Sequence, residues 1–331
     1  MTVRILSGDC RATLATLPEA SVHCCVTSPP YFGLRDYGHA EQIGIEPTPD
    51  AYVAQLVEVF RSVRRVLRDD GTLWLNLGDS YAGSWGARGR GEGTNAAQPD
   101  LEHKHGTDAP NRHGFPSLGV KPKDLIGIPW RVAFALQADG WYLRQDVIWH
   151  KPNPMPESVT DRCTKAHEYV FLLSKGPRYW FDAEAIAEPA LAGPPGNVNP
   201  QKGAKAYAAG DEKRRTTVGL DAYAARQRAA RKDADEPGTR NRRSVWTIAT
   251  QPFAEAHFAT MAPELAETCI AAGCPPGGTV LDPFGGAGTT GLVADRMQRD
   301  AVLCELNPDY IAIAERRISG DAPLFASVEA A

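Results

Sequence analysis

Two short runs in the chain combine side chains and turns that are suited to chemistry. The first follows an apolar stretch near the amino end and reads Thr27-Ser28-Pro29-Pro30-Tyr31. Proline has no backbone N–H, so this turn presents carbonyl oxygens as acceptors, and the Ser28 hydroxyl adds another. Acceptors aimed at both protons of a ring-conjugated amine would help it attack an electrophile. Tyr31 offers an aromatic face on which a planar ring could stack. We therefore take Ser28, Pro29, Pro30 and Tyr31 as candidate catalytic residues.

The second run lies near the other end and is rich in glycine, Asp282-Pro283-Phe284-Gly285-Gly286-Ala287-Gly288-Thr289-Thr290. It sits between an expected strand, 279–281, and an expected helix, 289–297, where doubly wound sheets bind ligands. Glycines there would let the backbone approach a ligand without a Cβ clash. Glu305 ends the next expected strand, 20 residues after Gly285, and could accept hydrogen bonds from ribose hydroxyls. No lysine follows the glycines, which argues against a triphosphate-binding loop.

The elements expected around these runs alternate between strand and helix. Residues 21–27 predict a buried strand, and a helix should begin with Thr48 as N-cap and Pro49 in its first turn. We expect that helix to close at Gly71 and a strand to follow over 72–77. Further expected elements are a helix over 128–138, strands over 142–149, 167–173 and 301–304, and helices over 262–272 and 308–318. This order predicts an α/β fold with a doubly wound, mostly parallel sheet.

Two segments break this alternation. Residues 82–123 hold eight glycines and four prolines and predict a long loop. Residues 183–243 carry twelve Lys/Arg against eight Asp/Glu, although the whole chain has a net charge of −4. A basic segment in an otherwise acidic protein is typical of a nucleic-acid-binding region, and a solvated loop is the alternative explanation. We therefore divide the chain into 1–182, an insertion over 183–245, and 246–331.

Length and composition limit the classes of protein to consider. The chain has 331 residues, 43% of them apolar, which suffices for a large core. We expect a soluble cytoplasmic protein, because no signal-peptide pattern or 20-residue apolar run occurs. The seven cysteines include no Cys-x-x-Cys pair, so we expect neither a disulfide framework nor a metal site, and Cys24 and Cys25 should be core residues.

Taken together, the runs resemble the β class of DNA amino-methyltransferases, in which the amine motif precedes the cofactor motif. The resemblance covers nearly the whole chain and implies a Rossmann-like methyltransferase fold with S-adenosyl-L-methionine as cofactor. It assigns the amine motif to residues 27–31 and a target-recognition role to the insertion. One departure is an extra residue in Met261-Ala262-Pro263 relative to the commoner family pattern. The resemblance implies cofactor contacts by Asp9, Cys10, Thr27, His257, Phe258, Thr260, Asp282, Phe284, Gly285, Gly286, Gly288, Thr289, Thr290, Glu305 and Asn307.

The resemblance also implies a site-specific enzyme of restriction-modification type that flips its target base out of duplex DNA. Ser28 favours cytosine N4 over adenine N6 on the resemblance alone. Two competing hypotheses are an RNA or protein-amide methyltransferase and a non-catalytic nucleic-acid-binding protein. A homodimer and a separately acting cognate restriction endonuclease are possible partners. Residues expected to line the base pocket or contact DNA are Trp149, Lys151, Arg88, Arg90, Arg214, Arg215, Arg240, Arg242 and Arg243.

Overall fold

We describe the protein from a computed structural model that defines residues 1–34, 42–82, 120–121, 123–190, 239–251, 253, 260–321 and 327–330. The chain divides into two units by its internal contacts. The larger unit combines Met1–Asp182 with Arg243–Ala331, and the smaller unit is Ala183–Arg242.

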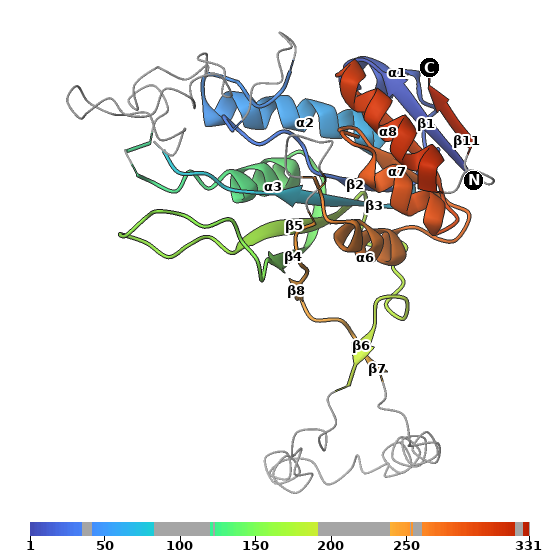
Figure 1. Ribbon diagram of the computed structural model, residues 1–331. Helices are drawn as coiled ribbons and strands as arrows, with labels where there is room; N and C mark the ends of the chain where they lie inside the picture. Colours follow the sequence, from blue (N-terminus) through green and yellow to red (C-terminus); the bar gives the residue numbers. More distant parts are fainter. Residues whose placement is uncertain are drawn as a thin grey trace, which may run out of the picture. The chain divides into compact units, whose positions relative to one another are not determined.

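The larger unit is built on one sheet, which has nine strands in the described part of the chain (Figure 1). Five neighbouring pairs at one end of the sheet are parallel, and among these nine strands only β5 runs against its neighbours, β3 and β4. The doubly wound, mostly parallel fold expected from the sequence is therefore confirmed. In spatial order the strands are β11 (Ser327–Ala330), β1 (Thr2–Ser7), β10 (Asp300–Glu305), β9 (Thr279–Asp282), β2 (Val22–Thr27), β3 (Leu67–Leu77), β5 (His167–Ser174), β4 (Tyr142–His150) and β8 (Val245–Thr247).

Helices pack on the sheet in two groups, as Figure 1 shows. One group, in mutual contact, is α1 (Cys10–Thr16), α2 (Pro49–Val66) and α3 (Ile128–Ala138). The other is α6 (Pro263–Gly273), α7 (Thr289–Arg296) and α8 (Pro308–Asp321). The expected start of α2 is confirmed, because the Thr48 hydroxyl accepts a hydrogen bond from the Ala51 N–H (3.1 Å) and Pro49 opens the helix.

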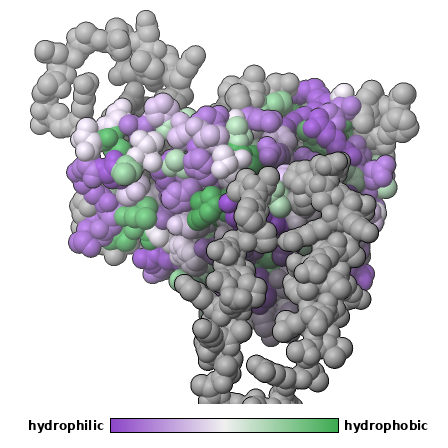
Figure 2. Space-filling view, turned by 90° about the horizontal axis from the view of Figure 1, so that it is seen from below, coloured by the Kyte–Doolittle hydropathy of each residue, from purple (hydrophilic) through white to green (hydrophobic). Residues whose placement is uncertain are grey.

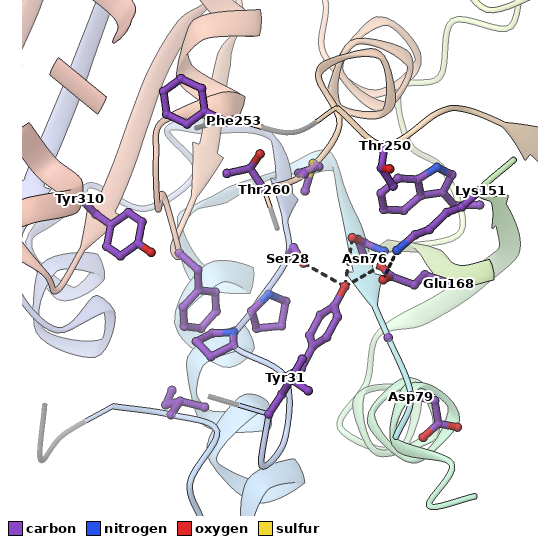
Figure 3. A pocket seen from close by; sticks show the side chains of 18 of the residues that line it. Ser28, Tyr31, Asn76, Asp79, Lys151, Glu168, Thr250, Phe253, Thr260 and Tyr310 are labelled. Atoms are coloured by element: carbon purple, nitrogen blue, oxygen red, sulfur yellow. Dashed lines mark hydrogen bonds and ion pairs between the residues drawn. The ribbon is translucent and has the colours of Figure 1, made fainter. Parts of the chain in front are cut away.

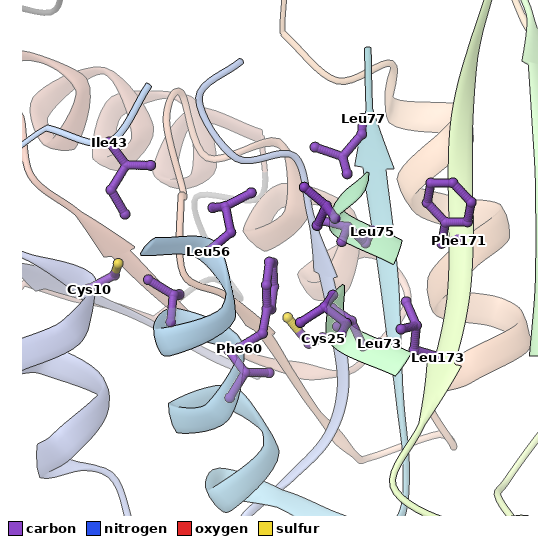
Figure 4. Close-up of a cluster of buried hydrophobic side chains, with 14 of the residues drawn as sticks. Cys10, Cys25, Ile43, Leu56, Phe60, Leu73, Leu75, Leu77, Phe171 and Leu173 are labelled. Carbon is purple, nitrogen blue, oxygen red and sulfur yellow. The ribbon is translucent and has the colours of Figure 1, made fainter. Parts of the chain in front are cut away.

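The core lies between α2 and the sheet (Figure 4). Leu56 and Phe60 project from α2 toward Leu73 of β3 and Cys25 of β2, and all four side chains are fully buried. Burial raises the pKa of the Cys25 thiol well above its ordinary value, so the thiol stays protonated. Cys24 and Cys25 are core residues, as the sequence predicted.

One element boundary differs from the prediction. We expected Asp69, Asp70 and Gly71 to end the helix, but α2 ends at Val66 and β3 already begins at Leu67. The register between β2 and β3 shifts in this stretch. A Cβ at Gly71 would stand 3.0 Å from the His23 carbonyl oxygen of β2, so the glycine serves close packing of two strands and not a helix end.

The smaller unit contains one short antiparallel pair among its described residues, β6 (Glu188–Pro189) with β7 (Thr239–Arg240). The Arg240 guanidinium forms an ion pair with Glu188 across it (2.7 Å). Residues 191–238, which hold most of the expected basic segment, lie outside the described residues.

The described residues of the surface are mainly polar on the face seen in Figure 2, where apolar side chains occur in small scattered groups. No helix within the described ranges has the length and apolar character needed to cross a bilayer.

Candidate functional site

A cavity of about 900 Å³ opens at the carboxyl ends of the central parallel strands. Its wall includes Gly8 after β1, Glu305 at the end of β10, Pro283 after β9 and Ser28 after β2. Asn76, near the end of β3, completes this row. The two runs singled out in the sequence thus face one cavity, because parallel strands bring their carboxyl ends to one edge of the sheet.

One side of the cavity carries a carboxylate fixed by backbone N–H groups. Glu305 Oε2 accepts from the Gly286 N–H (2.7 Å) and Oε1 accepts from the Asn307 N–H (2.8 Å). Burial is the main cause that raises the pKa of Glu305, and these hydrogen bonds oppose it. The carboxylate is therefore held in one orientation on the wall. Phe284, Asn307 and Thr260 are also among the residues that line the cavity.

Asp9 and Cys10 also lie on this wall, at the start of α1. Asp9 caps the helix by accepting from the Arg11 N–H (2.7 Å), and its carboxylate is paired with the Arg11 guanidinium. The side-chain hydrogen bond from Arg11 lowers the pKa of Asp9, so the acid remains ionised. Burial raises the pKa of Cys10 to about 12, which makes it a neutral, space-filling group.

Asp282 has a different place from the one expected for a cofactor ligand. Its carboxylate is buried behind the wall and accepts from the hydroxyls of Thr27 (2.6 Å) and Thr290 (2.7 Å) and from the Phe284 N–H (3.0 Å). Burial raises the pKa of Asp282 against the effect of these bonds. The three side chains join the ends of β2 and β9 to the start of α7, and none of them is among the cavity-lining residues.

The glycines of this run also differ from expectation. A Cβ at Gly285 would stand 2.9 Å from Leu303 Cβ, and one at Gly288 would stand 2.8 Å from Ala314 Cβ. These two glycines therefore let the turn pack against β10 and α8, whereas we had expected room for a ligand. Gly286 adopts a positive φ of 49° and donates its N–H to Glu305. Thr289 is buried and accepts from Arg317 (2.9 Å).

The opposite side of the cavity is a network of side chains (Figure 3). The Ser28 hydroxyl donates to the Tyr31 hydroxyl (3.3 Å), which donates to Glu168 Oε2 (2.7 Å). Asn76 donates to the same carboxylate oxygen (3.1 Å). Burial and the Glu168 charge raise the pKa of Tyr31 well above its ordinary value. Tyr31 therefore keeps its proton and acts as a hydrogen-bond donor.

Three further contacts fix this network. The Lys151 ammonium forms an ion pair with Glu168, and the two side chains are only 19% and 15% exposed. A Cβ at Gly78 would stand 2.5 Å from the Tyr31 ring, so only glycine leaves room for the ring beside the end of β3. The Tyr52 hydroxyl donates to the Pro30 carbonyl (2.8 Å), which anchors the Pro29-Pro30 turn from α2.

Trp149 borders the cavity as a largely buried residue. Its indole N–H donates to the Ile248 carbonyl (2.9 Å), and the Lys151 ammonium lies 4.3 Å from its ring centroid. The ring therefore joins β4 to the segment after β8 and supports Lys151. Both residues expected at the base pocket are among the lining residues.

Of the remaining expected residues, the three that the structure describes are not among the lining residues of the cavity. Arg240 is paired with Glu188 in the smaller unit, which also contains Arg242. Arg243 begins the second part of the larger unit, where its carbonyl accepts from the Trp246 indole (2.9 Å). The other six lie outside the described residues: His257, Phe258, Arg88, Arg90, Arg214 and Arg215.

Sequence reasoning missed several polar residues of the wall, among them Asn76, Asp79, Lys165 and Glu168. The available signal was a polar residue at one end of an apolar strand: Asn76 lies near the last residue of β3, and Glu168 lies near the first residue of β5. Because β5 is antiparallel to β3 and β4, its start lies at the same edge, where Trp149 pairs with Glu168. Lys165 donates to the Asp79 carbonyl (2.9 Å), and burial lowers the pKa of its ammonium.

Comparisons with known proteins agree with this arrangement. The sequence model of the family described as DNA methylase (N6_N4_Mtase) matches residues 22–316. The type II methyltransferase M.XycI of Xanthomonas campestris pv. cyanopsidis is 44% identical over 317 residues, 96% of this chain and 87% of that protein. M.SmaI of Serratia marcescens, also a type II methyltransferase, is 44% identical over 315 residues, 95% and 90% of the two chains.

Two solved structures share the fold. The PvuII DNA methyltransferase, described as cytosine-N4-specific, aligns with a TM-score of 0.59 at 18% identity over 99% of this chain and 96% of that one. A protein of Thermus thermophilus described as a DNA modification methylase, solved with S-adenosyl-L-methionine, gives a TM-score of 0.57 at 23% identity over 99% of both chains.

Proposed function

Because the chain belongs to the family of N6/N4 DNA methylases, we propose that it transfers a methyl group from S-adenosyl-L-methionine to the exocyclic N4 of cytosine at specific sites in duplex DNA. The observation that carries this proposal is the cavity itself. It places Ser28 and Tyr31 on one wall and Glu305 on the other. A volume of about 900 Å³ is at the upper end of the range for small-molecule sites, which suits two ligands side by side.

The Glu305 side of the cavity fits the cofactor. Glu305 offers carboxylate oxygens to ribose hydroxyls at the end of β10, and Phe284 gives an apolar surface for an adenine ring. Asp9 and Asn307 add polar groups at the ends of β1 and β10. S-adenosyl-L-methionine supplies a methyl group that is electrophilic because it is bonded to a sulfonium. Asp282, Thr27 and Thr290 hold this wall in place from behind.

The Ser28 side fits an amine. An exocyclic amine is a weak nucleophile, because its lone pair is conjugated into the base, and acceptors on its protons localise that pair. The Ser28 hydroxyl and the Pro29 carbonyl supply such acceptors in our proposal. Tyr31 packs against Gly78 and binds Glu168 through its hydroxyl, so its position is fixed before a base arrives. Much of the rate then comes from orientation.

The cavity can receive a base only if that base leaves the duplex. Flipping costs a few kcal/mol of stacking and pairing, which contacts in a fitted pocket offset. We propose that the basic insertion over 183–245 and the segment 82–123 grip the duplex through phosphate contacts. Binding should then weaken steeply as salt rises. A homodimer and a separately acting restriction endonuclease are further proposals, taken from the family resemblance.

The choice of cytosine rests on Ser28. In the class of enzymes that the chain resembles, Asp or Asn at that position usually goes with adenine N6, so adenine N6 is the alternative target. The test is to incubate the native protein with unmodified DNA and labelled S-adenosyl-L-methionine, digest the product and identify the modified nucleoside by mass spectrometry. N4-methylcytosine is the expected product, and N6-methyladenine would overturn the base assignment. Modification-sensitive sequencing of the same DNA gives the target sequence.

A further inference from the structure

The proton that leaves the target amine needs an acceptor, and the cavity wall contains several carboxylates. Asp79 Oδ1 accepts from three backbone N–H groups, those of Ser80 (2.9 Å), Gly127 (3.0 Å) and Ile128 (3.0 Å). Glu157 is paired with Arg162 (2.6 Å). Asp9 and Glu305 lie on the cofactor side. Among the described residues of the wall, this leaves Glu168 as the carboxylate that is hydrogen-bonded to the amine motif.

Resting on the proposed function, we propose that Glu168 is the final acceptor of the amine proton, which reaches it through the hydroxyls of Ser28 and Tyr31. The hydrogen bonds already run in one direction, from Ser28 to Tyr31 and from Tyr31 to Glu168. Figure 3 shows this line of side chains, and an amine N–H that donates to Ser28 would extend it. Each hydroxyl can accept one proton while it passes on its own.

Atoms and charges balance in this step. The nitrogen–carbon bond forms as the carbon–sulfur bond breaks, and the bonding pair stays on sulfur, which becomes neutral. The nitrogen gains positive charge and loses it with the proton, which ends on Glu168 as a neutral carboxylic acid. Solvent takes this proton after the product leaves. No oxidant or further reactant is needed.

The surroundings of Glu168 suit an acceptor. Lys151 from the end of β4 forms an ion pair with the carboxylate, and Asn76 from β3 donates to Oε2, so two side chains fix its orientation. Among the described residues, Glu168 also interacts electrostatically with Lys165, His167 and Tyr31. The raised pKa of Tyr31 keeps its hydroxyl protonated, as a relay requires.

Glu168→Gln tests this route, because the amide keeps an oxygen for Tyr31 but cannot take a proton. We expect single-turnover methylation of unmodified plasmid DNA to slow about 100-fold, the usual contribution of a positioned proton acceptor. The dissociation constant for S-adenosyl-L-methionine should stay within about twofold, since Glu168 lies on the other wall. A Glu168→Gln rate near the native one would overturn the proton route.

Matched variants sharpen the result. Glu58→Gln makes the same change on an exposed position of α2 and should leave the rate unchanged. Lys151→Met removes the ion pair that fixes the Glu168 carboxylate and should slow methylation without weakening cofactor binding; an unchanged rate counts against the route. Absence of DNA labelling by the native protein would contradict the proposed function itself, whereas equal rates for native and Glu168→Gln would contradict the proton route alone.

Tyr31→Phe gives a second test that does not depend on Glu168→Gln folding. It keeps the ring against Gly78 and removes only the middle hydroxyl. We expect a loss of about 100-fold, and the double variant with Glu168→Gln should be no slower than the slower single variant. Losses that multiply in the double variant would show independent roles and overturn the relay.

Discussion

Glu305 and Glu168, on opposite walls of the cavity, are held in different ways. Glu305 accepts from the backbone N–H groups of Gly286 and Asn307, in the glycine-rich turn and directly after its own strand. On the amine side, Glu168 is held by Tyr31, Asn76 and Lys151, side chains that come from three other segments. The first arrangement is local and tied to the backbone, and the second is assembled across the sheet.

This difference suggests a division of labour. A carboxylate held by backbone groups keeps its orientation whatever neighbouring side chains do, which suits recognition of a cofactor. A carboxylate held by side chains can exchange protons and partners, which suits chemistry on an amine. Substitutions on the cofactor side should therefore affect binding and folding, and those on the amine side should affect the rate. Four experiments test that separation.

The largest effect is expected on the amine side. Ser28→Ala and Tyr31→Ala should each lower the single-turnover rate about 1000-fold, because each removes a group that orients the amine or its acceptor. The dissociation constant for S-adenosyl-L-methionine, measured by calorimetry, should change less than about threefold. An equal loss of cofactor affinity would show that the two walls are not separate in function.

The next effect is on folding. Asp282→Asn replaces a carboxylate that accepts three buried hydrogen bonds by an amide, whose NH2 group cannot accept and faces a hydroxyl or N–H donor at one of these positions. The free energy of unfolding should fall by about 3 kcal/mol. Thermal or urea denaturation measures it, with Asp309→Asn on the exposed start of α8 as control. An unchanged free energy of unfolding would show that the hydrogen bonds of Asp282 do not stabilise the fold.

A smaller effect is expected from pH on cofactor binding. Burial raises the pKa of Glu305 above its ordinary value of 4.5. Its ionised form, the better acceptor for ribose hydroxyls, is therefore lost already at a pH above 4.5 as the solution is acidified. The affinity for S-adenosyl-L-methionine should fall as Glu305 becomes protonated. The Glu305→Gln variant should bind the cofactor about tenfold more weakly than the native protein and should not show this pH dependence. For folding the sign is opposite, since a raised carboxyl pKa makes this group's contribution more favourable at low pH. Affinity that is independent of pH in the native protein would contradict the role of Glu305.

The smallest effect should come from Gly78→Ala. The added methyl group overlaps the Tyr31 ring, and the ring must shift while its hydroxyl remains attracted to Glu168. We expect the methylation rate to fall about tenfold, because misplacement of a reacting group by about 1 Å is costly. Cofactor affinity should not change. Gly176→Ala, which meets nothing within 4 Å, is the control, and equal rates for the two variants would remove Gly78 from the site.

The same contrast explains what the sequence could predict. The amine run and the glycine-rich run are each continuous in the sequence. Helix α2 is marked by Thr48, Pro49 and the helical spacing of its apolar residues. Each of the three could therefore be found without knowledge of the fold. Strands β1 and β11 and helix α1 are short and were not predicted. Glu168 was missed because its place depends on the pairing of β5 with β3 and β4, which no local pattern encodes. The motif pointed to Asp282, but it could not reveal that the side chain is buried between Thr27 and Thr290, because a motif does not show which way a side chain points.

The order of strands also bears on how the molecule is made. Among the described strands, β1 pairs with β10 and β11, whose residues lie after position 299. While the chain grows on the ribosome, β1 cannot pair with both of these strands until residues 300–330 have been synthesised. Strands β2 and β3 can pair much earlier. Contacts of such long sequence separation are slow to form, and open strand edges are prone to aggregation. Strands β2 and β3 should therefore pair first during synthesis, and β1 should pair with β10 and β11 last.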